Sequence, residues 1–158
     1  MKLLDKSFDN IDELINLYKN RSLKELQKIT PKWAYGENHD KSLNLLNEPN
    51  NERYTTYIVK TNELIRKSEF NEVDLESLFT DESLNNKRIA RLLFHWENNR
   101  FVDPPEVFIS LNSFDRLQFS DGRHRTKLTY FLECKEIPII LDKSDIKYVK
   151  KMINIRSI

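Results

Sequence analysis

The chain has 158 residues, of which 39% are hydrophobic and 32% are charged, and this balance is typical of a folded globular protein rather than a disordered one. Its 26 basic and 25 acidic residues leave a net charge of +1, which argues against a protein that coats nucleic acid, so any site for a polyanion must be local. The single cysteine excludes an internal disulfide, and no spacing of Cys and His indicates structural zinc.

The beginning of the chain lacks the apolar core of a signal peptide, and no stretch has the length and hydrophobicity of a membrane span. We therefore expect a cytoplasmic protein that has no membrane partner. Internal repeats and low-complexity tracts are absent from the sequence, which favours one domain with small extensions.

Residues 8–30 are predicted to form one or two helices, because apolar residues recur there at helical spacing. A polar, irregular stretch follows, with a linker around residues 47–53. We interpret residues 1–53 as a helical extension and linker. Its helices either pack on the domain as scaffold or offer a surface to a protein partner. Its aromatic residues either anchor the extension to the core or form a platform that stacks on a base: Trp33, Tyr35 and His39.

Two predicted elements come before the central stretch of the chain. The alternation of Tyr54, Thr56 and Ile58 predicts a strand, which runs directly into a helix near Leu64. A strong helix is predicted over residues 84–98. One face of that helix carries basic residues that either flank a phosphate or nucleic-acid site or are simply solvated: Arg88, Arg91 and His95.

Residues 116–132 are predicted to form a strand, a tight turn and a helix. Leu117 and Phe119 alternate with polar residues, which is the period of a half-buried strand. Gly122 follows the strand, and because the chain has only two glycines, we expect it where backbone geometry or a close approach requires it. The apolar residues downstream recur at helical spacing: Leu128, Phe131 and Leu132.

The chemistry of this turn points to an anion. The first turn of a helix has free backbone N–H groups and a partial positive charge. Gly122 lets a ligand approach, His124 exchanges a proton near neutral pH, and the neighbouring arginines are fork-shaped donors suited to phosphate. Asp121 caps the helix, positions an arginine or holds a hydrated divalent ion. We predict that phosphate or a nucleotide is bound by Gly122, Arg123, His124, Arg125 and Thr126.

The alternative interpretation is an ordinary strand-to-helix turn, with Asp121 as the N-cap and solvated basic side chains. After the central helix, residues 136–141 are predicted to form a strand. Residues 144–155 are predicted to form a basic amphipathic helix, so we treat 143–158 as a C-terminal helix packed on the domain.

The segment from about Pro104 to Leu141 resembles the ParB/sulfiredoxin superfamily. It contains, in order, a Pro-Pro element before a strand, a short hairpin, a D-G-x-H-R box at residues 121–125, a helix and an Ile-Pro strand at Ile137 and Pro138. This resemblance implies a compact α/β (α+β) fold with a small mixed sheet over residues 54–142. It also implies that the box binds nucleotide phosphates, with ATP or CTP and Mg²⁺ as the expected ligands.

The same resemblance implies roles for single residues. His124 would orient phosphate or transfer a proton, and Asp121 would cap the turn or support Mg²⁺. In a serine kinase of the family an early acidic residue is the catalytic base, and Glu63 is the nearest counterpart, in competition with Glu69 and Glu72.

Two departures from the family bear on activity. Arg123 stands where sulfiredoxin has its catalytic cysteine, so sulfiredoxin chemistry is not expected. The partition proteins have a glycine-rich arginine box that is not found here, and no helix-turn-helix domain follows the resembling segment. The leading hypothesis is therefore a nucleotide- or nucleic-acid-binding domain with phosphotransferase or nuclease activity, the latter including toxins. The alternative is a non-catalytic protein-binding module, such as an immunity protein, inhibitor or accessory factor.

Overall fold

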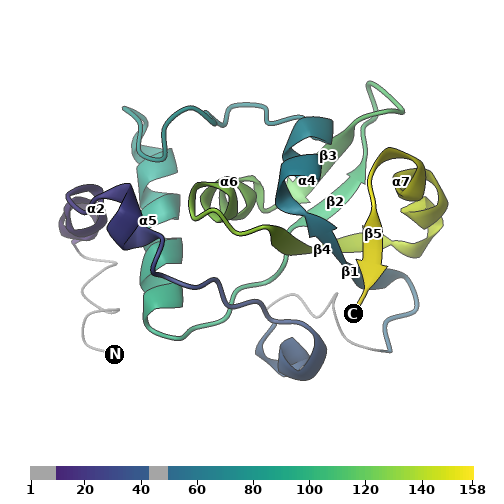
Figure 1. The fold of residues 1–158 in the computed structure, drawn as a ribbon, viewed down its shortest axis with the longest axis horizontal. Coiled ribbons are helices and arrows are strands. Elements are labelled where there is room, and N and C mark those ends of the chain that lie inside the picture. Colours follow the sequence, from purple (N-terminus) through teal and green to yellow (C-terminus); the bar gives the residue numbers. More distant parts are fainter. Residues whose placement is uncertain (1–9, 43–49) are drawn as a thin grey trace.

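The computed structural model describes residues 10–42 and 50–158, so part of the predicted linker around 47–53 and the beginning of the first predicted helix lie outside the described residues. The fold is mixed α/β, as the sequence predicted, with helices, short 3₁₀ helices (η) and strands (Figure 1). In chain order the elements are α2 (Ile11–Lys19), α3 (Leu23–Leu26), η1 (Gly36–Lys41), β1 (Tyr54–Lys60), α4 (Thr61–Lys67), α5 (Ser83–Glu97), β2 (Glu106–Ile109), β3 (Leu117–Asp121), α6 (Arg123–Phe131), β4 (Glu136–Asp142), η2 (Lys143–Asp145), α7 (Ile146–Met152) and β5 (Ile155–Ser157).

The sheet has five strands in the order β3-β2-β4-β1-β5. All neighbouring strands are antiparallel except β2 and β4, which are parallel, so the sheet is mixed as expected. Pro138 is tolerated inside β4 for a geometric reason. The N–H of Ile140 points to the side of β2, where it donates to the carbonyl of Pro105, the residue just before that strand. Because alternate residues point the same way, the nitrogen of Pro138 also faces that side, and β2 pairs with β4 only from Ile140 onward.

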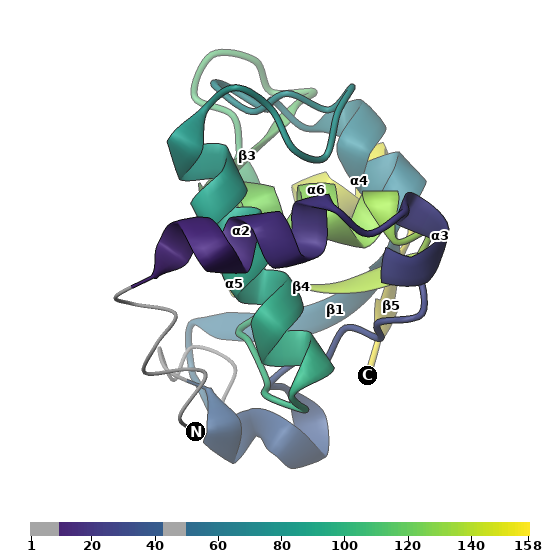
Figure 2. The ribbon, with the colours of Figure 1, turned by 90° about the vertical axis from the view of Figure 1, so that its left-hand side faces the viewer.

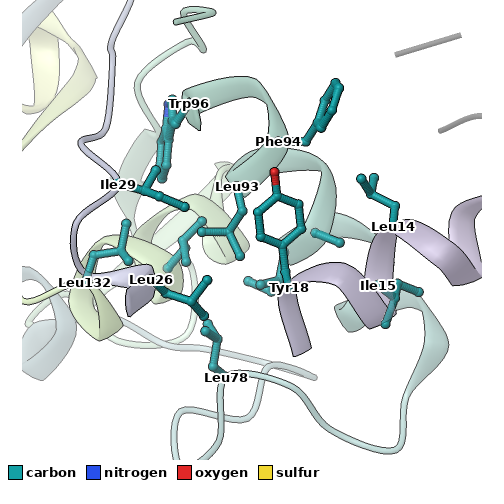
Figure 3. Close-up of a cluster of buried hydrophobic side chains, with 13 residues drawn as sticks. Leu14, Ile15, Tyr18, Leu26, Ile29, Leu78, Leu93, Phe94, Trp96 and Leu132 are labelled. Carbon is teal, nitrogen blue, oxygen red and sulfur yellow. The ribbon is translucent and has the colours of Figure 1, made fainter. Parts of the chain in front are cut away.

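The helices form layers beside the sheet. Figure 1 shows α6 between α5 and the sheet, and the view turned by 90° in Figure 2 shows α2 crossing in front of α5. The apolar faces of α2 and α3 pack on α5 (Figure 3), where Tyr18, Leu26 and Leu93 belong to one buried cluster. These two helices therefore act as scaffold at their apolar faces, which is one of the two roles that the sequence left open.

Trp33 anchors the N-terminal extension to the rest of the protein. Its ring contacts Trp96 of α5 edge-on, with 5.2 Å between ring centroids, and its backbone forms an isolated bridge with Val102. The anchoring role expected for Trp33 is confirmed by these contacts.

The C-terminal segment differs from the sequence prediction. A helix over 144–155 was expected, but α7 ends at Met152 and the chain then forms β5, which pairs with β1. Ile153 adopts an extended conformation and is buried, so it contributes to the core from outside the helix. The extended conformation lets Ile155–Ser157 satisfy the backbone groups on the free edge of β1, which a longer helix would leave unpaired.

Among the helices of the described residues, none combines the length and the apolar character needed to cross a membrane.

Candidate functional site

The turn between β3 and α6 requires glycine. Gly122 is the N-cap of α6 and has φ +100°, a conformation that favours glycine. A Cβ atom at this position would lie 2.6 Å from the Cβ and 2.7 Å from the Cα of Pro105. The close approach predicted from the sequence is therefore made by Pro105, whereas we had expected a ligand to lie there.

A cavity of about 480 Å³ opens beside this turn. Its walls come from α5, from the segment before β2, and from the end of β3 and the first turn of α6. The basic face of α5 predicted from the sequence lies here, so it flanks the D-G-x-H-R box in space. The charged and polar residues of the lining are Arg88, Arg91, His95, Asp103, Ser120, Asp121, Arg123, His124 and Arg125, and the apolar ones are Leu92, Phe101 and Val102.

Arg125 holds the turn together. Its Nη1 donates to the carbonyl of Asp103 at 3.0 Å, and its Nη2 donates to Oδ2 of Asp121 at 2.8 Å. Of the three roles considered for Asp121, the structure shows the positioning of an arginine. The N-cap role is wrong, because β3 continues through Asp121 and Gly122 occupies the N-cap position. Two nitrogens of Arg125 are thus engaged within the protein.

Arg123 also has an internal partner. Its Nη1 donates to the carbonyl of Asn71 at 2.7 Å, so the side chain ties the start of α6 to the loop after α4. Arg123 still lines the cavity and carries a permanent positive charge there.

Hydrogen bonding and local charge both bear on the protonation of His124. Its Nδ1 lies 3.4 Å from Nη1 of Arg88, and because a guanidinium can only donate, a hydrogen bond between the two requires Nδ1 as the acceptor and the proton on Nε2. Burial is the largest cause that lowers the pKa of His124, and together with the charges of Arg88, Lys127 and Arg123 it brings this pKa to about 4. At neutral pH the side chain is a neutral imidazole whose Nε2–H is a donor. This state favours orienting an anion over donating a proton as an imidazolium.

A buried lysine connects the two helices that contribute to the cavity. Lys127 is fully buried, and its Nζ donates to Oδ1 of Asn85 at 2.8 Å, which links α6 to the start of α5. Asn85 in turn donates to the carbonyl of Leu78 and to Oδ1 of Asn86. Burial lowers the pKa of Lys127, although the charges of Asp74 and Glu82 oppose that effect.

Two of the predicted site residues lie apart from the cavity. Thr126 is not among the described residues that line it, because its side chain is buried and its Oγ1 donates to the carbonyl of Gly122 at 2.9 Å. Glu63, expected as a catalytic base, lies on α4 and is also absent from the described lining, as are its competitors Glu69 and Glu72. The structure therefore does not bring Glu63 together with His124 and Asp121.

The carboxylates beside the site were only partly found from the sequence. Asp103 lines the cavity but was missed, since its only sequence signal is its place before the Pro-Pro element. Glu106 on β2 was missed as well. Burial raises the pKa of Glu106, and the nearby charge of Asp121 raises it further. Glu69 accepts hydrogen bonds from Ser110 and Gln118, so it holds the β2–β3 hairpin.

The described residues contain no group of three or more His, Cys, Asp and Glu side chains that could hold a metal ion. When the chain was compared with protein-family models, with curated proteins and with solved structures, nothing matched. The resemblance to the ParB/sulfiredoxin superfamily therefore rests on the residues quoted above, and the function has to be argued from the cavity itself.

Proposed function

We propose that this cavity binds a phosphate group of a nucleotide or of a nucleic acid. The observation that carries the proposal is the convergence of Arg88, His124 and the first turn of α6 on one wall of the cavity. Arg88 supplies a permanent charge, His124 supplies an Nε2–H donor, and the helix start supplies backbone N–H groups. Each of these groups is a donor, and phosphate oxygens are acceptors.

The charge of the lining supports an anionic ligand. Four arginines face two aspartates, and the pKa of His95, like that of His124, is lowered, so both histidines are neutral at pH 7. The lining as a whole is therefore positive, although the whole chain is nearly neutral. A local positive cavity on a neutral protein attracts a small anion without attracting polyanions everywhere.

The rest of the cavity suits the non-phosphate part of a nucleotide. Its volume lies within the range of small-molecule sites, and Leu92, Phe101 and Val102 provide an apolar surface for a base or sugar. Mg²⁺, if required, would arrive with ATP or CTP, and Asp103 and Asp121 are the carboxylates in the lining that could contact it. We extend the proposal to a ParB/sulfiredoxin-like domain, supported by the order along the chain of the β2–β3 hairpin, the box at the start of α6, and the Ile-Pro strand β4.

Calorimetric titration with ATP, ADP, CTP and GTP, each with Mg²⁺, tests this proposal. Wild type should bind at least one of them saturably, and His124→Asn should lose most of that affinity because it removes the Nε2–H donor. The matched control is His39→Asn, since His39 lies on η1 and is not among the described residues that line the cavity. Absence of binding in wild type, or equal affinity in the two variants, would overturn the proposal.

Turnover separates the catalytic versions of the proposal. Release of phosphate from a bound nucleotide would support a phosphotransferase or nucleotidase. Cleavage of labelled DNA or RNA, together with growth inhibition that His124→Asn relieves, would support a nuclease of the toxin type. Binding without either reaction would support a regulatory nucleotide site.

A second candidate function, a protein-binding module, is favoured by one observation away from the cavity. Leu111 and Phe114 at the tip of the β2–β3 hairpin are 87% and 89% exposed. Two large apolar side chains exposed on one short loop can mark an interaction site. A photo-crosslinker placed at Ser113 should then capture one partner in cells, and the double variant Leu111→Ser, Phe114→Ser should abolish the crosslink. A crosslink that survives the double variant would exclude the hairpin as the interface.

A further inference from the structure

We propose that Arg91 and His95 of α5 form a second anion subsite, which binds a further phosphate group of the same ligand. This inference rests on the proposed function, because it adds a position to the phosphate site at the start of α6. It assigns to the cavity a ligand with at least two linked phosphates, such as a nucleoside diphosphate or triphosphate or a short nucleic-acid strand.

The spacing along α5 supports two positions. Arg88, Arg91 and His95 lie three and four residues apart, so they share one helix face, and all three line the cavity. With a rise of about 1.5 Å per residue, the face extends about 10 Å from Arg88 to His95. A single phosphate on Arg88 and His124 covers only the end of that face nearest α6, and the remainder lies one to two helical turns further along the same cavity wall.

The local charge at the far end of the face also points to an anion. The pKa of His95 is lowered first by its burial and then by the positive charges of Arg100 and Arg91. The aspartates of the lining belong to other elements, at the segment before β2 and at the end of β3. The positive charges of Arg91 and Arg100 thus act on the imidazole of His95, and a second phosphate would accept hydrogen bonds from Arg91 and from the imidazole.

The test compares ligands that carry one, two or three phosphate groups. Affinities of wild type for inorganic phosphate, pyrophosphate and tripolyphosphate, and for AMP, ADP and ATP, are measured at constant ionic strength. We expect affinity to rise by about tenfold with the second phosphate, which is the scale of one charge-assisted contact. Arg91→Gln should reduce that rise to less than about threefold, because the charge-assisted contact is lost and only the bond from neutral His95 and long-range attraction remain. Arg88→Gln should instead weaken all the ligands by a similar factor.

A matched control tests whether the loss of any one positive charge from α5 is enough to reduce this rise in affinity. Lys87→Gln deletes one positive charge from the same helix, but Lys87 is not among the described residues that line the cavity, so the rise should persist. His95→Asn gives a second test of the subsite that is independent of Arg91→Gln, and thermal unfolding followed by circular dichroism verifies that each variant is folded.

The outcomes separate this inference from the proposed function. Binding of phosphate or AMP without any rise for the longer ligands would overturn the second subsite and leave the first in place. A rise that persists in both Arg91→Gln and His95→Asn would also overturn it. If wild type binds none of these ligands, both the second subsite and the proposed function are overturned. The dinucleotide pTpT identifies the source of the phosphates: tighter binding of ADP assigns a nucleoside polyphosphate, and tighter binding of pTpT assigns a nucleic-acid strand.

Discussion

Replacing Gly122 by alanine should destabilise the protein strongly, and the structure allows the size of the effect to be worked out. A left-handed backbone conformation costs a non-glycine residue about 1–2 kcal/mol. The new Cβ would also lie 2.6 Å from the Cβ of Pro105, closer than real Cβ contacts, so the backbone around Pro105 must shift. Such overpacking costs about 1–3 kcal/mol, and the sum is about 2–5 kcal/mol of unfolding free energy.

The other glycine of the chain is a matched control. Gly36 has φ +59°, but no described atom would lie within 4 Å of an added Cβ. Gly36→Ala should therefore cost only the conformational term, about 1–2 kcal/mol, and the entropy change of the unfolded chain is the same in both variants. Urea unfolding followed by tryptophan fluorescence measures both. Equal losses of stability in the two variants would refute the claim that contact with Pro105 requires a glycine at position 122.

Two further predictions concern the first turn of α6. Arg125→Ala should lower the unfolding free energy by roughly 1.5–3 kcal/mol without any ligand, because the bonds to Asp103 and Asp121 are lost; unchanged stability in urea would contradict this. His124→Asn should flatten the pH dependence of stability. Between about pH 4 and 6.5 the unfolded chain binds a proton at His124 that the native state does not, so wild-type stability falls as pH falls through this window. The full shift corresponds to about 3 kcal/mol, which solvent screening of the half-buried ring reduces to roughly 1–2 kcal/mol. Parallel pH curves for wild type and variant would contradict this.

The arrangement of elements around the turn was predictable because local pattern and tertiary structure agree there. Alternation at Leu117 and Phe119 marked a strand, and the structure has β3 at Leu117–Asp121. The rarity of glycine marked Gly122, and its backbone conformation bears that out. The basic stripe of α5 was also visible as a spacing. What the spacing left open was whether the stripe faces solvent or a cavity, since that depends on where α6 and the segment before β2 lie.

Hydrogen-bond partners distant in the chain were not predictable from residue types. Arg123 and Arg125 were assigned to phosphate, yet each donates to a backbone carbonyl, that of Asn71 and that of Asp103 respectively. Every residue has such a carbonyl, so sequence carries no signal for which one is used. Glu63 lies outside the cavity lining for a related reason. It was assigned from its order in the chain, whereas the cavity is lined by α5, the segment before β2, the end of β3 and the start of α6, and α4 contributes no described residue.

Helix α6 shows most clearly where a pattern of apolar residues gives only part of the burial. The sequence predicted a core stripe at Leu128, Phe131 and Leu132, and this is confirmed, because Leu128 and Leu132 belong to one buried cluster and Phe131 packs against it. In the structure α6 lies between α5 and the sheet, and Thr126, Lys127, Leu128 and Thr129 are all fully buried. The polar members of this run each have a partner, which is how buried polar groups are tolerated: Thr126 donates to the carbonyl of Gly122, Lys127 to Asn85, and Thr129 to the carbonyl of Arg125.

The position of Lys127 bears directly on the candidate site. Lysine is among the residue types least often buried, so the residue type alone predicts a surface position for Lys127. Its burial puts a positive charge one helical turn from His124 and joins α6 to α5 through Asn85, so the helix that carries the box and the helix that carries the basic face are held in one arrangement. The bond between Lys127 and Asn85 therefore helps to set the relative placement of Arg88 and His124, and a ligand of the kind proposed above would meet donors whose positions are already set.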